Sequence, residues 1–179
     1  MDRDALDGRH RAWGGKIDYP NDLWDVALTY EWLGDGFDPS LGFVPRRGVQ
    51  IINFNVNFQP RPGRPILGLH VRQMFHEWLN TVVTDLDGRR ESYRFFTAPV
   101  NWRLESGDRF ELNVVPTGER LNLPFEILEG VVIPEGTYHW NRYRIEGGLA
   151  AKRRVSAQVS WWFGDFYAGR LDEYLLTAS

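Results

Sequence analysis

The chain has 179 residues, of which 21 are basic and 24 acidic, and its formal net charge of −3 argues against a nucleic-acid partner. It has no cysteine, so disulfides and thiolate metal sites are excluded. No run of about 18 apolar residues occurs, which excludes a transmembrane helix but leaves a membrane-spanning β-barrel open. Residues 1–15 lack the apolar segment of a signal peptide, and we expect them to be a polar lead.

After this lead, most segments alternate between apolar and polar side chains, which predicts β-strands. In chain order we expect strands near 17–20, 24–32, 48–58, 66–83, 90–104, 108–117, 137–149 and 153–163, and a ninth at 170–177. Short turns predict antiparallel neighbours, and two longer connections, 33–48 and 117–136, are typical of a barrel with one elaborated rim. The expected fold class is all-β: residues 16–179 form one domain, an antiparallel up-and-down meander of about eight strands that makes a β-barrel or part of a larger one.

The segment from Trp24 to Trp32 alternates most strictly. Its apolar side chains belong to Trp24, Val26, Leu28, Tyr30 and Trp32, and those between them to Asp25, Ala27, Thr29 and Glu31. At ~3.3 Å per residue the two tryptophans lie roughly 26 Å apart along the strand. After a tilt of about 40° this span is roughly 20 Å, close to the ~25 Å apolar band between the aromatic girdles of outer-membrane barrels. A protein core gives the same alternation, so this strand alone leaves core, sugar and lipid open as partners of the apolar side.

Two later strands place neutral polar side chains opposite apolar ones. Asn53, Asn55 and Asn57 alternate with Ile52, Phe54, Val56 and Phe58, and Gln158, Ser160 and Trp162 alternate with Val159, Trp161 and Phe163. Amides and hydroxyls can line a water-filled lumen, whereas an open soluble surface usually carries more Lys and Glu. Lysine occurs only at Lys16 and Lys152. These features favour lipid on the apolar side.

Two sets of candidate site residues follow. The lipid-facing set is Trp24, Val26, Leu28, Tyr30, Trp32, Phe54, Val56, Phe58, Val159, Trp161 and Phe163. The lumen or rim set is Asn53, Asn55, Asn57, Trp102, Trp140, Arg142, Arg144 and Trp162. In the second set the tryptophans are candidates for sugar contact, and the arginines are expected to pair with acids such as Glu111 or Glu146 across strands.

The expected strand at 66–83 does not fit this arrangement, because Gln73 and Glu77 share a face with Leu69, Val71 and Leu79. A carboxylate near the middle of a bilayer is costly. We therefore expect this strand to bulge, shift its register or end near the rim.

Six stretches carry a family resemblance: YPNDLWDVALTY (19–30), FDPSLGFVPRRGV (37–49), VTDLDGRRESY (83–93), SGDRFELNVVPTGERL (106–121), VVIPEGTYHWNRYRI (131–145) and WFGDFYAGR (162–170). Together they resemble the bacterial family of domains of unknown function numbered 5916. The resemblance implies the outer-membrane β-barrel region of a larger Gram-negative protein, which typically follows a domain similar to family 9 carbohydrate-binding modules. This chain has no such domain and ends in LLTAS, so we expect a fragment. The family offers no agreed catalytic residues. Its link to sugar is an analogy that depends on the carbohydrate-binding domain that usually precedes it.

We therefore expect a non-enzymatic segment of the bacterial outer membrane that contacts lipid, has an anchoring or passage role, and is linked to carbohydrate binding or uptake through the missing domain. No catalytic constellation, metal site or cofactor motif is recognisable. Two alternatives stay open: a soluble β-sandwich that binds carbohydrate through exposed aromatic side chains, and a lipocalin-like barrel with a small hydrophobic ligand. They differ in where the apolar face points, because lipid needs it outward and the alternatives need it covered.

Overall fold

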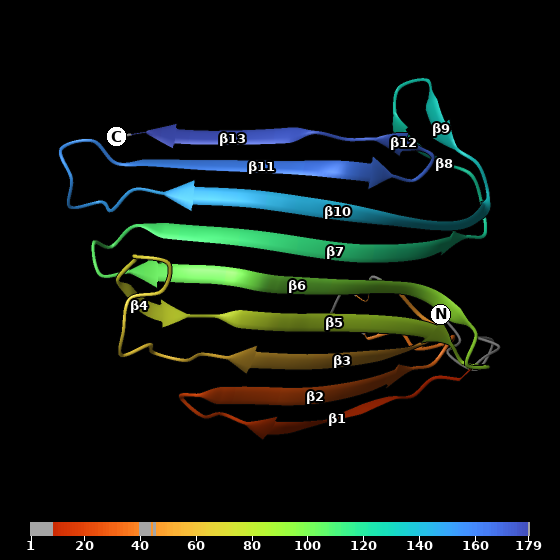
Figure 1. Cartoon of the computed structure of the whole chain (residues 1–179). Helices are drawn as coiled ribbons and strands as arrows, with labels where there is room; N and C mark the ends of the chain where they lie inside the picture. The colour runs from red at the N-terminus through yellow and green to blue at the C-terminus, as the bar shows by residue number, and fades with distance from the viewer. Residues whose placement is uncertain (1–8, 40–43, 45, 179) are drawn as a thin grey trace.

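The computed structural model describes residues 9–39, 44 and 46–178. Within them the chain is all-β and contains no helix, and accordingly none that could cross a membrane. One antiparallel sheet of 11 strands dominates the structure, and most consecutive strands are neighbours in it (Figure 1). The predicted all-β antiparallel meander is confirmed.

The main sheet contains β1 (Ala12–Tyr19), β2 (Trp24–Leu33), β3 (Val49–Phe58), β4 (Val71–Met74), β5 (His76–Asp85), β6 (Arg90–Leu104), β7 (Arg109–Leu121), β10 (Gly136–Gly148), β11 (Ala157–Phe166), β12 (Gly169–Arg170) and β13 (Glu173–Ala178). A separate hairpin is formed by β8 (Phe125–Leu128) and β9 (Val131–Ile133). The path through the main sheet is β1-β2-β3-β5-β6-β7-β10-β11, with β12 and β13 both paired to β11 and β4 paired to β6.

The structured segments are more extensive than the sequence predicts at two places. β1 begins at Ala12, inside the expected polar lead, of which residues 1–8 lie outside the described part of the chain. Gly14 and Gly15 interrupt the alternation there, so the pattern that announces a strand is weak. The expected connection at 117–136 contains the end of β7 and the whole β8–β9 hairpin.

The register of the strand pairs defines two faces of the sheet. Leu28 of β2 lies opposite Phe54 of β3, and Thr29 lies opposite Asn53. Because side chains alternate along a strand and paired residues share a face, we call the side of Leu28 and Phe54 the apolar face and the side of Thr29 and Asn53 the polar face. The registers of the other strand pairs extend this assignment of the two faces across the sheet, from β1 to β13.

Two neighbouring irregularities keep the polar side chains on one face. The expected strand at 66–83 is broken at Phe75, whose N–H donates to the Asn101 carbonyl at 2.8 Å. In the adjacent strand β6, the pairing with β7 shifts between Thr97 and Val100. The β6 shift brings Asn101 onto the polar face. Glu77 lies on the polar face as well, and Leu79 shares that face with it. An irregularity is present as predicted, but it does not separate Glu77 from Leu79, because the side of this strand that carries both residues is the polar face.

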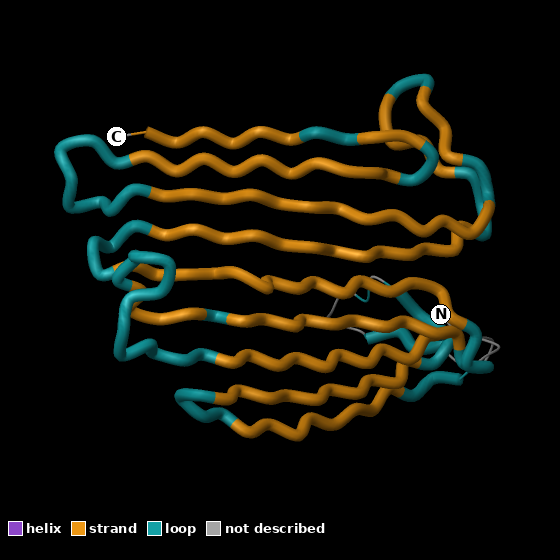
Figure 2. Tube along the Cα trace, in the orientation of Figure 1, coloured by secondary structure: helices purple, strands orange, loops and turns teal. Residues whose placement is uncertain are grey.

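The connections gather at two ends of the sheet (Figure 2). We call the end with the turns 20–23, 105–108 and 149–156 the turn end, and the opposite end, with the connections 34–48 and 122–135, the loop end. The two long connections expected from the sequence therefore share one end. The connection 59–70, also long, lies at the turn end.

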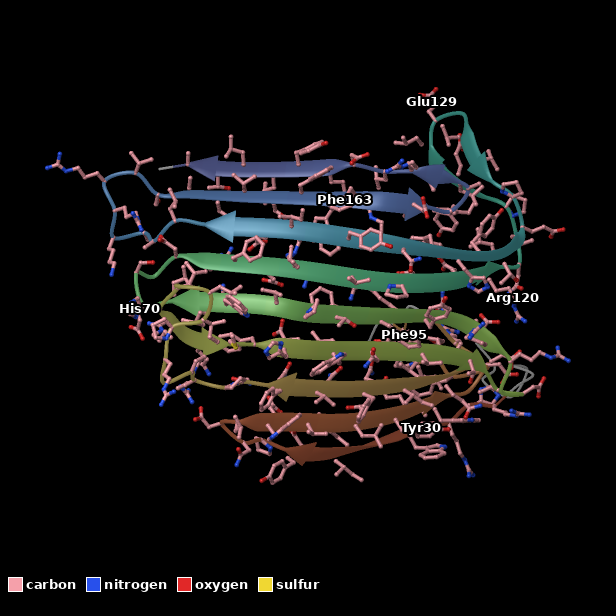
Figure 3. All side chains as sticks on the ribbon, in the orientation of Figure 1. Tyr30, His70, Phe95, Arg120, Glu129 and Phe163 are labelled. Atoms are coloured by element: carbon pink, nitrogen blue, oxygen red, sulfur yellow. The ribbon has the colours of Figure 1, made fainter. Side chains whose placement is uncertain are left out.

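The main sheet is open. β1 and β13 each pair on one side only, and no described strand joins them. The other sheet in the described residues is the β8–β9 hairpin, so no second sheet of comparable size packs against the first. The side chains project from both faces of a single layer (Figure 3), and closure into a barrel is not seen in these strands.

Candidate functional site

The apolar face exposes large hydrophobic side chains across the whole sheet. Ile17 on β1 is 75% exposed, Phe54 on β3 45% and Val159 on β11 51%. Further exposed members of this face are Trp13, Tyr19, Trp24, Leu28, Ile52, Trp78, Phe110, Tyr143, Ile145, Tyr174 and Leu176. Soluble monomers rarely leave so continuous an apolar surface in water. This face therefore requires an apolar partner, which is either lipid or protein.

Aromatic rings gather at two levels of the apolar face. At the turn end, the rings of Trp24 and Phe58 stack with centroids 4.4 Å apart. At the loop end, Trp13 stacks on Trp32 with centroids 6.4 Å apart. Between the two levels the face carries both aliphatic and aromatic side chains, such as Leu28 and the Phe54 opposite it. Aromatic side chains at both ends of an apolar band are typical of membrane interfaces.

Every residue of the predicted lipid-facing set lies on the apolar face. The members on β2 and β3 are paired with one another, as for Val26 and Val56. On β11, Trp161 lies opposite Ile145 and Phe163 opposite Tyr143. The strands that carry the set are thus far apart in the sheet order but share one surface.

An ion-pair network occupies the polar face between β7 and β10. Glu111 and Glu146 lie directly opposite each other, an arrangement that is unfavourable for like charges. Arg144 bridges them, because Nη2 pairs with Glu111 and Nη1 lies 3.2 Å from Glu146. Arg109 Nη2 lies 2.6 Å from Glu146, and Asn113 donates to Glu111 at 3.0 Å and accepts from Arg144 Nε at 2.6 Å. The two cations balance the two carboxylates, so no net charge is buried here.

A second polar group adjoins this network on β3, β5 and β6. Asn101 donates from Nδ2 to Glu77 Oε2 at 3.2 Å. Three further polar atoms, Asn57 Oδ1, Asn101 Oδ1 and Arg103 Nη1, are buried without a hydrogen-bond partner in the described part of the chain. Proteins satisfy such groups with water or with a bound polar molecule. The composition of this face therefore suits a hydrated surface.

An aromatic cluster lies over the polar face at the loop end. Tyr167, in the turn after β11, packs on Trp140 at 4.6 Å and on Tyr138 at 5.3 Å between ring centroids. Its hydroxyl donates to Glu119 Oε2 at 2.7 Å, and Arg46 Nη2 lies 3.5 Å from the other oxygen of Glu119. Burial, together with this carboxylate, raises the pKa of Tyr167 well above its usual range. Glu119 thus connects the turn after β11 to β7.

Most of the predicted lumen or rim residues lie on the polar face: Asn53, Asn55, Asn57, Trp140, Arg142, Arg144 and Trp162. The Arg144 guanidinium lies 5.1 Å from the centre of the Trp162 ring, on whose face it packs. Arg144 has the partners expected from the sequence, whereas Arg142 pairs with Glu173 of β13 at 2.5 Å. Trp140 is 7% exposed, so its ring is occupied by neighbouring aromatic side chains and offers little surface to a ligand.

Trp102 does not belong with this group, which corrects the prediction. It lies opposite Phe110 on the apolar face, near the turn end, while its neighbour Asn101 lies on the polar face. The register shift between Thr97 and Val100 exchanges the two faces of β6 beyond that point. A regular alternation read through the whole strand cannot anticipate this exchange.

Sequence reasoning did not single out Arg109, Asn113 or Tyr167. A signal for the first two was present, because Arg109, Glu111 and Asn113 alternate along one strand as Arg144 and Glu146 do along another. Alternating opposite charges on two neighbouring strands indicate a cross-strand ladder. Tyr167 gives no such signal, since its φ of 51° and its partners depend on the turn that follows β11.

None of the protein-family models, curated proteins or solved structures compared with this chain matches it. The family resemblance therefore remains a prediction. Among the described residues, no group of three or more His, Asp or Glu side chains is placed to hold a metal ion. The two faces of the sheet are therefore the features that bear on function.

Proposed function

We propose that this chain is a non-enzymatic segment of a bacterial outer-membrane β-barrel, with its apolar face toward lipid and its polar face toward a hydrated interior. One observation carries the proposal: amide and charged side chains are buried on the polar face while large apolar side chains are exposed on the opposite face. Asn113, Asn101, Glu111 and Glu146 are each at most 6% exposed. Large apolar side chains on the opposite face remain accessible.

The apolar face supports lipid contact through its extent and its chemistry. Removing apolar surface from water is favourable by roughly 25 cal/mol per Å², so contact with lipid would stabilise this face, whereas leaving it in water forgoes that stabilisation. In the central part of the face, Leu28, Phe54 and Val56 carry no charge. Charged side chains at the middle of the lipid-facing surface cost barrels about 2–4 kcal/mol each, so their absence from this stretch fits the proposed environment.

The polar face supports an interior in contact with water. It contains ion pairs such as that of Arg144 and Glu111, and the side-chain oxygens of Asn57 and Asn101 have no hydrogen-bond partner in the described residues. Such a surface suits the interior of a membrane barrel, where polar side chains face a channel or a plug. The same face would be unsuitable as a dry binding site for a hydrophobic ligand.

Strand direction supports a barrel that needs further strands. β1 and β13, the two edge strands, run in the same direction (Figure 1). Joining them directly would create one parallel pair, whereas bacterial single-chain barrels have an even number of antiparallel strands. Unpaired edges also promote association in water. The anchoring or passage role is therefore proposed for a larger assembly of which this sheet is part.

The resemblance to family 5916 agrees with this proposal and adds its link to carbohydrate, which stays an analogy. The β-sandwich alternative requires a second sheet over the apolar face, and the main sheet is paired with none in the described residues. The lipocalin alternative requires the apolar face inside a closed barrel. Neither alternative is favoured by an observation on this chain, so we do not propose them.

Single-cysteine labelling tests the proposal, and the chain offers a clean background because it has no cysteine. Cysteines would replace Leu28, Phe54, Val56 or Val159 on the apolar face, and Asn55 on the polar face as the matched control. The chain would be reconstituted in lipid bilayers and treated with a polar and a lipophilic thiol reagent. We expect the first group to react only with the lipophilic reagent. Protection of that group from both reagents would mean a covered protein core and would refute the lipid assignment.

A further inference from the structure

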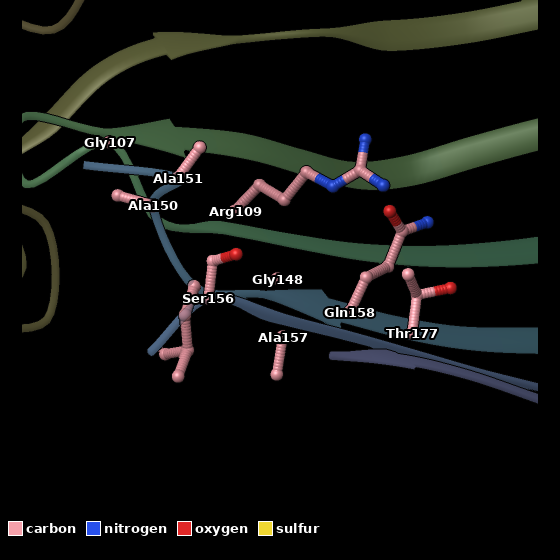
Figure 4. A pocket seen from close by; sticks show the side chains of 10 residues that line it. Gly107, Arg109, Gly148, Ala150, Ala151, Ser156, Ala157, Gln158 and Thr177 are labelled. Carbon is pink, nitrogen blue, oxygen red and sulfur yellow. The ribbon is translucent and has the colours of Figure 1, made fainter. Parts of the chain in front are cut away.

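A cavity of about 230 Å³ lies at the turn end of the polar face. It is lined by the turns 105–108 and 149–156 and by the adjoining ends of β7, β10, β11 and β13 (Figure 4). Its principal lining residues are Gly107, Arg109, Gly148, Ala150, Gln158 and Thr177. None of the predicted site residues lines it, and it adjoins the ion-pair network of the polar face through Arg109, which pairs with Glu146.

Small residues create the space. A Cβ on Gly148 would lie only 3.0 Å from Arg109 Nε, and a Cβ on Gly107 would lie 3.0 Å from the Cβ of Ala150. Gly107 also has a φ of +89°, which disfavours any larger residue. Larger side chains at these two positions would press on the cavity wall, so the cavity depends on glycine.

The two turns that border the cavity are tied together by Asp108. Its carboxylate accepts the Ala150 N–H at 2.8 Å, the Ser106 hydroxyl at 2.8 Å and Arg153 Nε at 3.2 Å. These bonds connect the turn before β7 to the turn before β11. The cavity is therefore preformed, which lowers the entropic cost of binding.

Three polar side chains reach the same side of the cavity, whereas Ala150 and Ala151 lie on the other (Figure 4). Arg109 is held by Glu146 at 2.6 Å and keeps further N–H groups. Gln158 and Thr177 lie opposite each other in the β11–β13 pair, and neither side chain is engaged by a hydrogen bond within the described residues. An amide and a hydroxyl can each donate and accept.

The charges favour an uncharged ligand. Arg109 is the charged residue in the lining, and Glu146 already neutralises it. An anion would compete with Glu146, and a cation would lie against the guanidinium. Lys152 and Arg154 of the neighbouring turn are exposed to solvent and do not line the cavity. The available groups instead match hydroxyls, which both donate and accept.

We propose that this cavity binds one small, uncharged, hydroxyl-rich molecule with the chemistry of a monosaccharide unit. Its volume lies below the ~300 Å³ at which sites for drug-sized ligands begin, so it suits a single ring. No aromatic side chain lines it, and hydrogen bonds rather than ring stacking hold the ligand. The proposal does not depend on which solvent contacts the apolar face, so it can fail or succeed separately from the proposed function.

Isothermal titration of the full chain in detergent tests this proposal with three probes: glucose, the anion glucuronate and the cation glucosamine. We expect glucose to bind at a single site and to bind more tightly than either charged sugar. Gln158→Leu and Thr177→Val each remove polar atoms at nearly constant volume, and each is expected to weaken glucose binding about fivefold to tenfold.

The matched control is Thr29→Val, which makes the same change on the polar face of β2, outside the cavity. It should bind glucose as the unaltered chain does. The circular dichroism of each variant shows whether it folds, and either cavity variant suffices if the other does not. Equal or tighter binding of glucuronate or glucosamine, no binding of glucose, or unchanged glucose binding by a folded cavity variant would each overturn the proposal.

Discussion

Arg144 of β10 and Glu111 of β7 form an ion pair on the polar face, with 18% and 7% of their side chains exposed. The pair lies on the side of the sheet where a soluble protein with this alternation would have its solvated surface. Arg144 also reaches Glu146, so one cation serves two carboxylates from adjacent strands. The stability of the sheet should therefore depend on this arginine.

Replacing Arg144 with Met should lower the free energy of unfolding by about 3 kcal/mol, because it leaves a buried carboxylate without a cation. The double variant Arg144→Met with Glu111→Gln should recover part of that loss. Urea unfolding in detergent, followed by tryptophan fluorescence, measures both values. Arg61→Met is the control, since Arg61 pairs with Asp22 at an exposed turn, and it should leave stability unchanged. A loss no larger in Arg144→Met than in the control would contradict the network's role.

Arginine substitutions at adjacent positions of β3 should separate the two faces. Phe54→Arg places a cation on the apolar face and should destabilise the bilayer-inserted chain by about 2–4 kcal/mol. Asn55→Arg places the same cation on the polar face and should cost clearly less. Unfolding from lipid vesicles gives both free energies. Equal costs at the two positions would mean that both faces meet the same solvent.

Tyr167→Phe should destabilise the loop end by about 1 kcal/mol, because the hydrogen bond to Glu119 is lost. The raised pKa of Tyr167 in the folded chain adds a pH dependence. Stability from this group is fully present below the ordinary tyrosine pKa of about 10 and is lost as the pH rises above it. Thermal unfolding between about pH 8 and 11 should therefore show a steeper decline for the unaltered chain than for the Phe variant. If the thermal stability of the two proteins declined in parallel with pH, this prediction would be wrong.

Asp108→Ala should release the two turns that border the cavity. The Ala150 N–H, followed by Ser106 and Arg153, holds the pKa of the Asp108 carboxyl below its usual value. Its contribution to stability is therefore present above the ordinary pKa of about 3.9 and is lost as the pH falls through the lower, folded value. Amide hydrogen exchange of Ala150 should accelerate in the variant at neutral pH. Asp87→Ala, at an exposed turn of the loop end, is the control and should leave this amide unchanged.

Much of the sheet is readable from the sequence because regular alternation and register agree. Val26 and Leu28 on β2 and Phe54 and Val56 on β3 share a face in the structure as their spacing predicts. The expected strand at 66–83 is interrupted at Phe75, but Glu77 and Leu79 share the polar face, so the pattern alone does not show which side of this strand is apolar. Local pattern is sufficient wherever strands pair without interruption.

The remainder depends on pairings between distant residues. Whether β6 shifts its register near Val100 is decided by the strands on either side, and that shift is what moves Trp102 to the apolar face. The hydrogen bond from the Ala150 N–H to the Asp108 carboxylate joins two turns that are far apart in the chain. The sequence signals each turn separately, but their contact exists only once β7, β10 and β11 are assembled.

The most direct test of the central claim is a nitroxide scan of β3 from residue 52 to residue 57 in lipid bilayers, one spin label at a time. Collision rates with oxygen, which concentrates in lipid, and with a water-soluble nickel complex report the solvent at each position. We predict that oxygen accessibility peaks at Ile52, Phe54 and Val56, and that nickel accessibility peaks at Asn53, Asn55 and Asn57, with a period of two. Low accessibility to both reagents at Ile52, Phe54 and Val56 would show a covered core and contradict the account.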